Sequence, residues 1–182
     1  FGREAASAGE QVAVPVDTSL AVADYLAEAG IETTRTPVGD VYVAAAASDP
    51  AVAFGGEPSG AWIWPDETLC PDGPLAACKI AALAAERPLA DRANDIETYP
   101  IRRTSAEVPD KAAVMDRVRE AVSERYDDVS TLDGVRVDRG DGWFLLRASG
   151  TQPLVRVTAE ARDSDRAEAV FGEATSLLET AR

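Results

Sequence analysis

The sequence predicts two small domains: an α/β domain with a mixed, mostly parallel sheet, followed by an α+β domain with an antiparallel sheet and helices on one face. Strand-like and helix-like segments alternate through the first half of the chain, as they do in parallel sheets. In the second half, short Asp-Gly turns separate strand-like segments, which favours antiparallel pairing. Between the halves, residues 87–94 carry charges and a proline without a long apolar period, so we assign the domains to residues 1–97 and 98–182.

The α/β domain opens on a run of apolar residues that predicts a buried strand. The polar cap Asp17-Thr18-Ser19 then precedes a helix that Gly30 ends, and Asp72-Gly73-Pro74 starts a longer helix through about Glu86. A third helix follows the turn at Gly39-Asp40. Strands are expected at 11–16, 31–36, 51–54 and 61–64, and the third helix at about 41–48.

The α+β domain is predicted from a strand, a helix, several strands and a last helix. Its hairpin signals are Asp133-Gly134 and Asp141-Gly142. Strands are expected at 98–106, near Val135, at 143–146 and at 154–159, and helices at 109–125 and from Ser164 onward.

The charge balance limits the classes of partner. With 32 acidic against 18 basic residues, the chain has a net charge of -14, which disfavours nucleic acid and anionic membranes as partners. Almost all basic residues are Arg, and Lys occurs only at Lys79 and Lys111. A carboxylate-rich, lysine-poor surface is typical of proteins from salt-loving microbes, although an ordinary acidic protein has the same balance.

The same composition indicates a cytoplasmic protein. No apolar run is long enough to span a bilayer, and no secretory signal is visible. We therefore expect Cys70 and Cys78 to be reduced core residues without metal or redox chemistry. Because the only methionine is Met115, we also expect the chain to be part of a longer protein.

A compact cationic turn, Arg147-Ala-Ser-Gly-Thr-Gln-Pro153, is the first candidate site. Small side chains let backbone N–H groups converge on an anion, and the arginine and hydroxyls add further donors. These are the parts of a phosphate cradle, although they also suit an ordinary hairpin turn. Arg156, on the next strand, either extends the cationic patch or forms a surface ion pair.

The stretch Phe54-Gly-Gly-Glu-Pro-Ser-Gly60 is the second candidate. A strand runs into paired glycines and then presents Glu57 and Ser59, whose oxygens can accept hydrogen bonds from the hydroxyls of a sugar. The alternative is a surface loop rich in Gly and Pro that carries an incidental charge.

Taken together and in this order, these motifs resemble those of the alpha-D-phosphohexomutase superfamily, which comprises phosphoglucomutases, phosphomannomutases and phosphoglucosamine mutases. The whole chain resembles the C-terminal half of these enzymes, their third and fourth domains. The segments that carry the likeness are Val14-Pro-Val-Asp-Thr-Ser19, Arg35-Thr-Pro-Val-Gly-Asp40, Gly55-Gly-Glu-Pro-Ser-Gly60 and Arg147-Ala-Ser-Gly-Thr-Gln-Pro153.

The resemblance implies a role for each loop. In the family the Gly-Glu-x-Ser-Gly loop contacts sugar hydroxyls, a role that falls here to Glu57 and Ser59. The Arg-x-Ser-Gly-Thr loop holds the phosphate that does not react, a role that falls to Arg147, Ser149, Gly150 and Thr151, with Arg156 as an additional candidate.

Departures from the family pattern exclude part of its chemistry here. The family's sugar loop commonly ends in His, where this chain has Ala61, and the chain contains no histidine. The family's phosphoserine loop and its Asp-Gly-Asp magnesium motif belong to its first two domains, and neither motif occurs in these residues. We therefore assign no catalytic residue and no metal site to this chain, and expect Mg²⁺ and a hexose 1,6-bisphosphate activator to serve the longer protein.

The sequence therefore predicts the C-terminal part of a phosphohexomutase that binds a small phosphosugar. A phosphomannomutase or phosphoglucomutase is the first choice among these enzymes. The reaction interconverts hexose 1-phosphate and 6-phosphate through a phosphoserine enzyme and a bisphosphate. The missing N-terminal domains are its required partner, so this chain alone is expected to be inactive. The alternative is a non-catalytic phosphosugar-binding or interaction module, which an upstream Ser-His loop and Asp-Gly-Asp motif would argue against.

Overall fold

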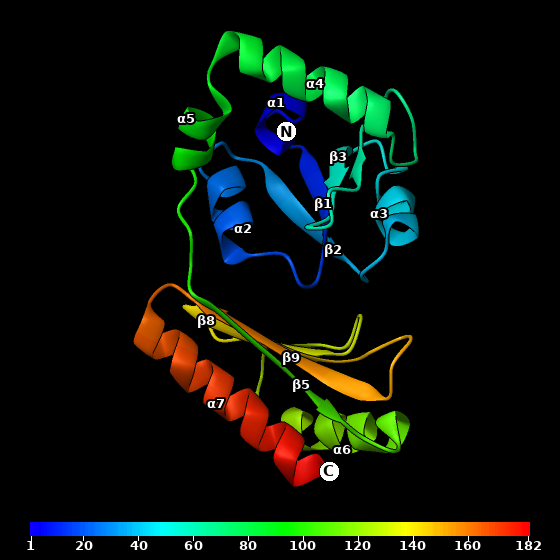
Figure 1. Cartoon of the computed structure of the whole chain (residues 1–182), viewed down its shortest axis with the longest axis vertical. Coiled ribbons are helices and arrows are strands. Elements are labelled where there is room, and N and C mark those ends of the chain that lie inside the picture. Colours follow the sequence, from blue (N-terminus) through cyan, green and yellow to red (C-terminus); the bar gives the residue numbers. More distant parts are fainter. The chain divides into compact units, whose positions relative to one another are not determined.

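The computed structural model describes residues 1–182, which form two compact units, residues 1–98 and 99–182 (Figure 1). Each unit has its own sheet and its own helices. The first contains α1 (Gly2–Ala5), β1 (Gln11–Pro15), α2 (Leu20–Ala27), β2 (Glu32–Thr36), α3 (Asp40–Ala46), β3 (Val52–Gly56), β4 (Trp62–Ile63), α4 (Gly73–Glu86) and α5 (Leu89–Asn94). The second contains β5 (Ile101–Glu107), α6 (Lys111–Ser123), β6 (Val129–Ser130), β7 (Val135–Asp138), β8 (Gly142–Ala148), β9 (Leu154–Ala161) and α7 (Ser164–Ala181).

The sheet of the first unit is mixed and mostly parallel, which confirms the predicted fold class. Its strand order is β2-β1-β3-β4, with β1 parallel to both β2 and β3 and only β4 antiparallel. The carboxyl ends of the three parallel strands therefore meet at one edge. In open α/β sheets this edge is where ligands bind.

Both faces of this sheet are covered, as a parallel sheet requires. Along β1, Val12 and Val14 belong to one apolar cluster and Ala13 to the other, because successive side chains point to opposite faces. The first cluster includes Leu26 of α2, whereas the second includes Val43 of α3. Figure 1 shows α2 and α3 on opposite sides of β1.

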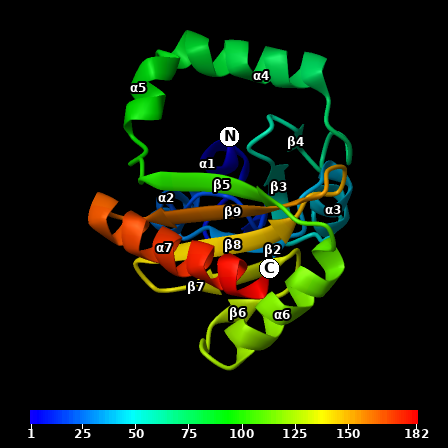
Figure 2. The ribbon, with the colours of Figure 1, turned by 60° about the horizontal axis from the view of Figure 1, so that its bottom comes forward.

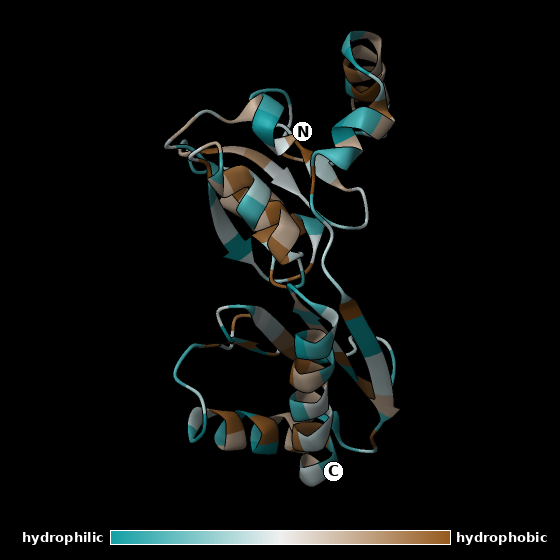
Figure 3. Cartoon of the chain, turned by 90° about the vertical axis from the view of Figure 1, so that its left-hand side faces the viewer, coloured by the Kyte–Doolittle hydropathy of each residue, from teal (hydrophilic) through white to brown (hydrophobic).

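The sheet of the second unit is entirely antiparallel, as predicted. Its order is β5-β9-β8-β7-β6, and Figure 2 shows α6 and α7 across the same face. One apolar cluster joins α6, α7 and the inner face of the sheet, including fully buried Val118 and Phe144. Figure 3 shows both brown and teal along α6 and α7, as expected for helices with one apolar side.

The longer helices begin where the sequence predicts them. The side chains of Ser19, Asp72, Asp110 and Asp163 each accept a hydrogen bond from a backbone N–H in the first turn of the following helix. Such a cap typically contributes about 1 kcal/mol, because it satisfies a donor that has no partner within the helix.

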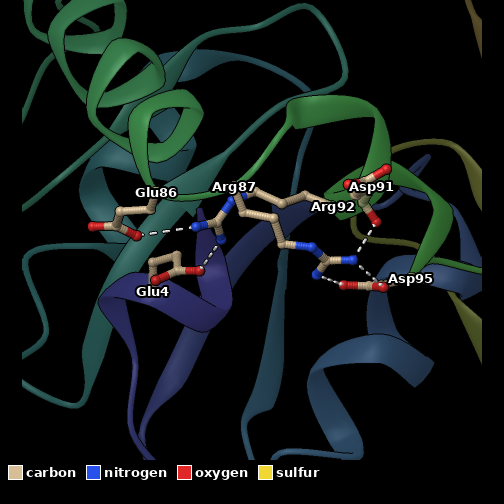
Figure 4. Close-up of polar contacts among 6 residues, drawn as sticks. All are labelled: Glu4, Glu86, Arg87, Asp91, Arg92 and Asp95. Carbon is tan, nitrogen blue, oxygen red and sulfur yellow. Dashed lines mark hydrogen bonds and ion pairs between the residues drawn. The ribbon is translucent and has the colours of Figure 1, made fainter.

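Residues 87–94, for which the sequence analysis expected no helix because they show no long apolar period, contain helix α5. None of its residues is buried, so apolar periodicity could not reveal it. Ion pairs hold it: Arg92 bonds to Glu4 of α1 and Glu86 of α4, and Arg87 bonds to Asp95 and to the carbonyl of Asp91 (Figure 4). The hydrogen bond from Arg87 lowers the pKa of Asp95.

Two smaller points of the sequence analysis need correction or addition. Cys70 and Cys78, expected in the core, are both exposed: Cys70 lies in the segment before α4, and Cys78 lies on α4, of which only Ala76 is buried. The short elements α1 and β6 were not predicted, since four and two residues are too few to show a period. No helix of the structure combines the length and apolar character needed to cross a membrane.

Candidate functional site

The sugar-loop candidate, residues 55–61, lies at the carboxyl edge of the parallel sheet. It connects β3 to β4 as a tight hairpin, in which Glu57 N donates to Ala61 O at 3.0 Å and Gly60 N donates to Glu57 O at 3.0 Å. Gly60 has φ of +91°, which side-chain-bearing residues adopt with difficulty. The turn therefore needs its glycine and presents residues 58–60 to solvent.

Glu57 is held by the residue that precedes a neighbouring helix. Its Oε1 accepts a hydrogen bond of 2.7 Å from the backbone N–H of Gly39, which immediately precedes α3. This places a carboxylate at a helix N-terminus, where the helix dipole favours negative charge. Ser59 Oγ donates to Glu57 Oε2 at 3.3 Å, so the structure brings the two predicted sugar ligands into contact with each other.

A cavity of about 480 Å³ adjoins this loop but does not match a sugar. Glu57 and Pro58 are among its lining residues. Most of its wall is apolar, with Val14, Leu26 and Phe54, although Thr18, Ser19 and Tyr25 also line it. A hexose carries hydroxyls over its whole surface, and burying them against apolar side chains costs free energy. The exposed side of the loop is therefore the better candidate.

The phosphate-loop candidate, residues 147–153, joins β8 to β9 in the second unit. Ser149 N donates to Leu154 O at 2.9 Å and closes the hairpin. Ser149 is only 6% exposed, and its Oγ accepts a hydrogen bond of 3.3 Å from Gln152 N. Its oxygen thus supports the turn, which leaves the hydroxyl proton for a ligand.

Gly150 and Thr151 form the exposed tip of this turn. No acceptor within the chain pairs with the amide N–H of either residue. A Cβ placed on Gly150 would meet no atom within 4 Å, so the backbone is open to close approach. Two adjacent unpaired amides at an exposed turn are available as hydrogen-bond donors to a ligand such as an anion.

Arg147 supplies the charge beside these amides. Its Nε lies 2.8 Å from Asp133 Oδ2, and this ion pair orients the side chain. No hydrogen bond within the chain engages the two terminal guanidinium nitrogens, so they remain as donors for a bidentate contact. Arg156 lies directly opposite Arg147 in the β8–β9 pairing and donates to Gln152 Oε1 at 3.4 Å, which gives two adjacent cations at the base of the turn.

Lys111 is a residue of this site that the sequence analysis missed. Its Nζ donates to the carbonyl of Ser149 at 2.5 Å and to that of Gln152 at 2.9 Å. In the sequence, the only feature that sets Lys111 apart is that it directly follows the helix-capping Asp110. Its contact with a loop 38 residues away could not be read from local pattern.

The acidic residues do not form a metal centre. No group of three or more Asp, Glu, His or Cys side chains lies close enough together to hold a metal ion. We therefore assign no metal ligand among the side chains of this chain.

Known families match both units. The family described as phosphoglucomutase/phosphomannomutase, alpha/beta/alpha domain III, matches residues 2–99. The phosphoglucomutase/phosphomannomutase C-terminal domain matches residues 103–176.

Similar proteins carry consistent names. A probable phosphoglucosamine mutase of Methanopyrus kandleri is 46% identical over 172 residues, which are 92% of this chain and 38% of that protein. One from Methanococcoides burtonii is 40% identical over all of this chain and 41% of its own length. The chain thus spans about two fifths of the length of these relatives.

Solved structures share the fold. A phosphoglucomutase/phosphomannomutase family protein from Burkholderia thailandensis superposes with a TM-score of 0.81 at 24% identity, over 96% of this chain and 38% of that one. An Aspergillus fumigatus N-acetylphosphoglucosamine mutase in complex with GlcNAc-6P and magnesium gives 0.70 at 15% identity, over 97% and 44% of the two chains. The two loops, the fold of both units and these matches together establish that the chain belongs to the phosphoglucomutase/phosphomannomutase family of the alpha-D-phosphohexomutase superfamily, of which it contains the third and fourth domains.

Proposed function

We propose that this chain is the substrate-binding C-terminal part of a cytoplasmic phosphohexomutase. In the proposed cycle, a phosphoserine outside this chain gives its phosphate to the free hydroxyl of a hexose monophosphate. The resulting hexose 1,6-bisphosphate then returns its other phosphate to the serine, so the 1- and 6-phosphates interconvert. Glu57 and Ser59 bind sugar hydroxyls, while Arg147, Ser149, Gly150 and Thr151 bind the phosphate that does not react. Mg²⁺ and a hexose 1,6-bisphosphate activator act at the missing domains.

The observation that carries this proposal is the pair of unpaired amides at Gly150 and Thr151 beside the terminal nitrogens of Arg147. In a chain of net charge -14, such a concentration of donors favours one small anion over an anionic polymer. Holding that phosphate and the sugar hydroxyls orients the substrate, which lowers the barrier without local acid-base chemistry.

The names of the relatives support a glucosamine phosphate as the substrate. The proteins from 36% to 46% identical are described as probable phosphoglucosamine mutases, in place of the mannose and glucose enzymes that we favoured from the sequence. The carboxylate of Glu57 also suits this substrate, because it can accept a hydrogen bond from an ammonium as well as from a hydroxyl.

The test is a phosphorus NMR assay of the longer protein that contains this chain. The 1- and 6-phosphates of glucosamine, glucose and mannose are supplied with Mg²⁺ and a hexose 1,6-bisphosphate. We expect interconversion, fastest for glucosamine. Failure to interconvert any of the three would refute the proposal, and preference for another hexose would refute only the choice of substrate.

Two variants test whether the phosphate loop contributes to the activity. Arg147→Ala is expected to raise KM by roughly tenfold or more, since a charged hydrogen bond to the phosphate is lost. Arg166→Ala is the matched control, because this arginine pairs with Asp141 at the opposite end of β8 and contacts neither loop. Equal effects of the two substitutions would contradict the assignment of Arg147.

The 182-residue chain by itself is expected to bind phosphosugar weakly and to show no turnover. Its missing histidine and catalytic residues favour the alternative of a binding module only if the longer protein is also inactive. Turnover by the purified chain would contradict the division of roles proposed here.

A further inference from the structure

We propose that Lys111 is a positioning residue that sets the phosphate loop in its binding conformation before the ligand arrives. The inference rests on the proposed function of residues 147–151, and it assigns to Lys111 a role in binding without a contact to the substrate. Its basis is the pair of hydrogen bonds from Nζ to the carbonyls of Ser149 and Gln152, at 2.5 and 2.9 Å.

The first of these bonds determines where an amide points. The peptide bond between Ser149 and Gly150 is trans, as are all peptide bonds of the chain. In a trans peptide the C=O and N–H point in opposite directions, so a carbonyl turned toward Lys111 directs the Gly150 N–H away from it. That amide has no acceptor within the chain. Lys111 therefore aims a free donor out of the turn.

The second bond uses a carbonyl whose peptide carries no donor. Gln152 precedes Pro153, which has no N–H, so binding this carbonyl stabilises the turn without redirecting any amide. Both carbonyls would otherwise present partial negative charge near a bound phosphate. An ammonium between them cancels part of that charge, which makes the turn more favourable for an anion.

The position of Lys111 is itself well fixed. It is the first residue of α6, and the capping side chain of Asp110 accepts from Ala113 N at 3.0 Å and sets the start of the helix. From the same segment, Val108 N donates to Pro153 O at 2.9 Å, and Val108 is buried in the core. Three hydrogen bonds thus join residues 108–111 to the loop. Because Val108 is buried in the core, they connect the loop to the core of the second unit.

Preorganisation of this kind improves affinity because the ligand does not have to order the loop. Lys111→Met keeps most of the length of the side chain and removes its donors. Lys79→Met is the matched control: it removes the other lysine, which pairs with Glu67 in the first unit, and so changes the net charge equally. Lys111→Arg keeps the charge and can donate to both carbonyls.

The experiment uses the 182-residue chain, labelled with nitrogen-15, and inorganic phosphate as the probe. Amide shifts of Gly150 and Thr151 report binding, and relaxation order parameters report how ordered the free loop is. In the free wild-type chain we expect order parameters of about 0.85 for these amides. In free Lys111→Met we expect them to fall below about 0.6. Phosphate affinity is expected to fall roughly tenfold in Lys111→Met, to be unchanged in Lys79→Met and to be largely restored in Lys111→Arg.

The outcomes separate this inference from the proposed function. If phosphate, titrated up to its solubility limit, does not shift the Gly150 and Thr151 amides of the wild-type chain, the phosphate role proposed for residues 147–151 fails and the inference falls with it. If the wild type binds and Lys111→Met binds within twofold, only the inference is overturned. It is also overturned if affinity falls while the free loop stays ordered, because Lys111 then acts through its charge alone. An unchanged amide spectrum of the core strands β8 and β9 shows that Lys111→Met has folded.

Discussion

The two loops of this chain are held by neighbouring helices in opposite ways. In the first unit, the side chain of Glu57 accepts a hydrogen bond from the backbone just before α3. In the second, the side chain of Lys111 at the start of α6 donates to the backbone of the loop. One loop is therefore anchored through a proposed ligand-binding side chain, and the other through carbonyls that a phosphate does not use.

This difference decides which substitutions change loop order and ligand binding together. Any change at Glu57 removes both the anchor of the sugar loop and a proposed sugar contact. In the phosphate loop the two proposed roles belong to different residues: Lys111 contacts the loop backbone, whereas Arg147 and the tip amides are the proposed ligand contacts. Binding and loop order can therefore be separated experimentally in the second unit and not in the first.

The cores of the two units also differ, and the largest expected effect tests this. Phe144 is fully buried within a single core and meets the ring of Tyr126 edge-on at 5.6 Å. Phe54, at 5% exposed, borders the cavity of about 480 Å³. Phe144→Ala is expected to cost about 4 to 5 kcal/mol of unfolding free energy, and Phe54→Ala about 3 kcal/mol or less, because part of that ring already lacks packing partners.

Native-state amide hydrogen exchange measures both free energies in the same chain. The slowest amides of β8 report the second unit, and those of β1 report the first. Each substitution is expected to affect its own unit. A larger loss of unfolding free energy from Phe54→Ala than from Phe144→Ala would contradict the expectation that the cavity leaves Phe54 less well packed.

Two glycines give the next largest contrast. A Cβ on Gly55 would lie 2.6 Å from Cγ1 of the fully buried Val43, so Gly55→Ala is expected to cost about 1 to 3 kcal/mol through forced repacking of α3. Gly150 has open space around it and no positive φ, so Gly150→Ala should change stability by less than about 0.5 kcal/mol.

Urea unfolding checks the stability of these variants, and titration with inorganic phosphate checks binding. Gly150→Ala is expected to weaken phosphate binding while leaving stability intact, since the added methyl group occupies the approach to the tip amides. Normal phosphate affinity in Gly150→Ala would move the proposed contact away from this position.

The smallest expected effect concerns Asp141, at the opposite end of β8 from the phosphate loop. The hydrogen bond from Arg166 lowers the pKa of this carboxyl. Because the folded pKa lies below the unfolded one, the pair stabilises the fold above the unfolded pKa, and this contribution is lost as pH falls through the folded pKa. Carbon-13 NMR titration should give a lower midpoint in the wild type than in Arg166→Gln. Equal midpoints would contradict this pairing.

The sequence was sufficient to predict the two sheets and the longer helices, because these depend on short-range pattern. Apolar runs mark strands, and Ser19, Asp72, Asp110 and Asp163 cap helices through bonds to residues two or three positions away. Helix α5 escaped prediction for the same reason: it buries no residue and is held by ion pairs, one of which joins Arg92 to Glu4 across 88 positions.

What only the tertiary structure decided is how each proposed site residue is held. The residue types of the loops, Glu57 with Ser59 and Arg147 with Thr151, are evident from the chain, as is the absence of histidine. The hydrogen bonds from Gly39 to the carboxylate of Glu57 and from Lys111 to the carbonyl of Ser149 join residues 18 and 38 positions apart. Such contacts follow from how strands and helices pack, and local sequence pattern carries no record of them.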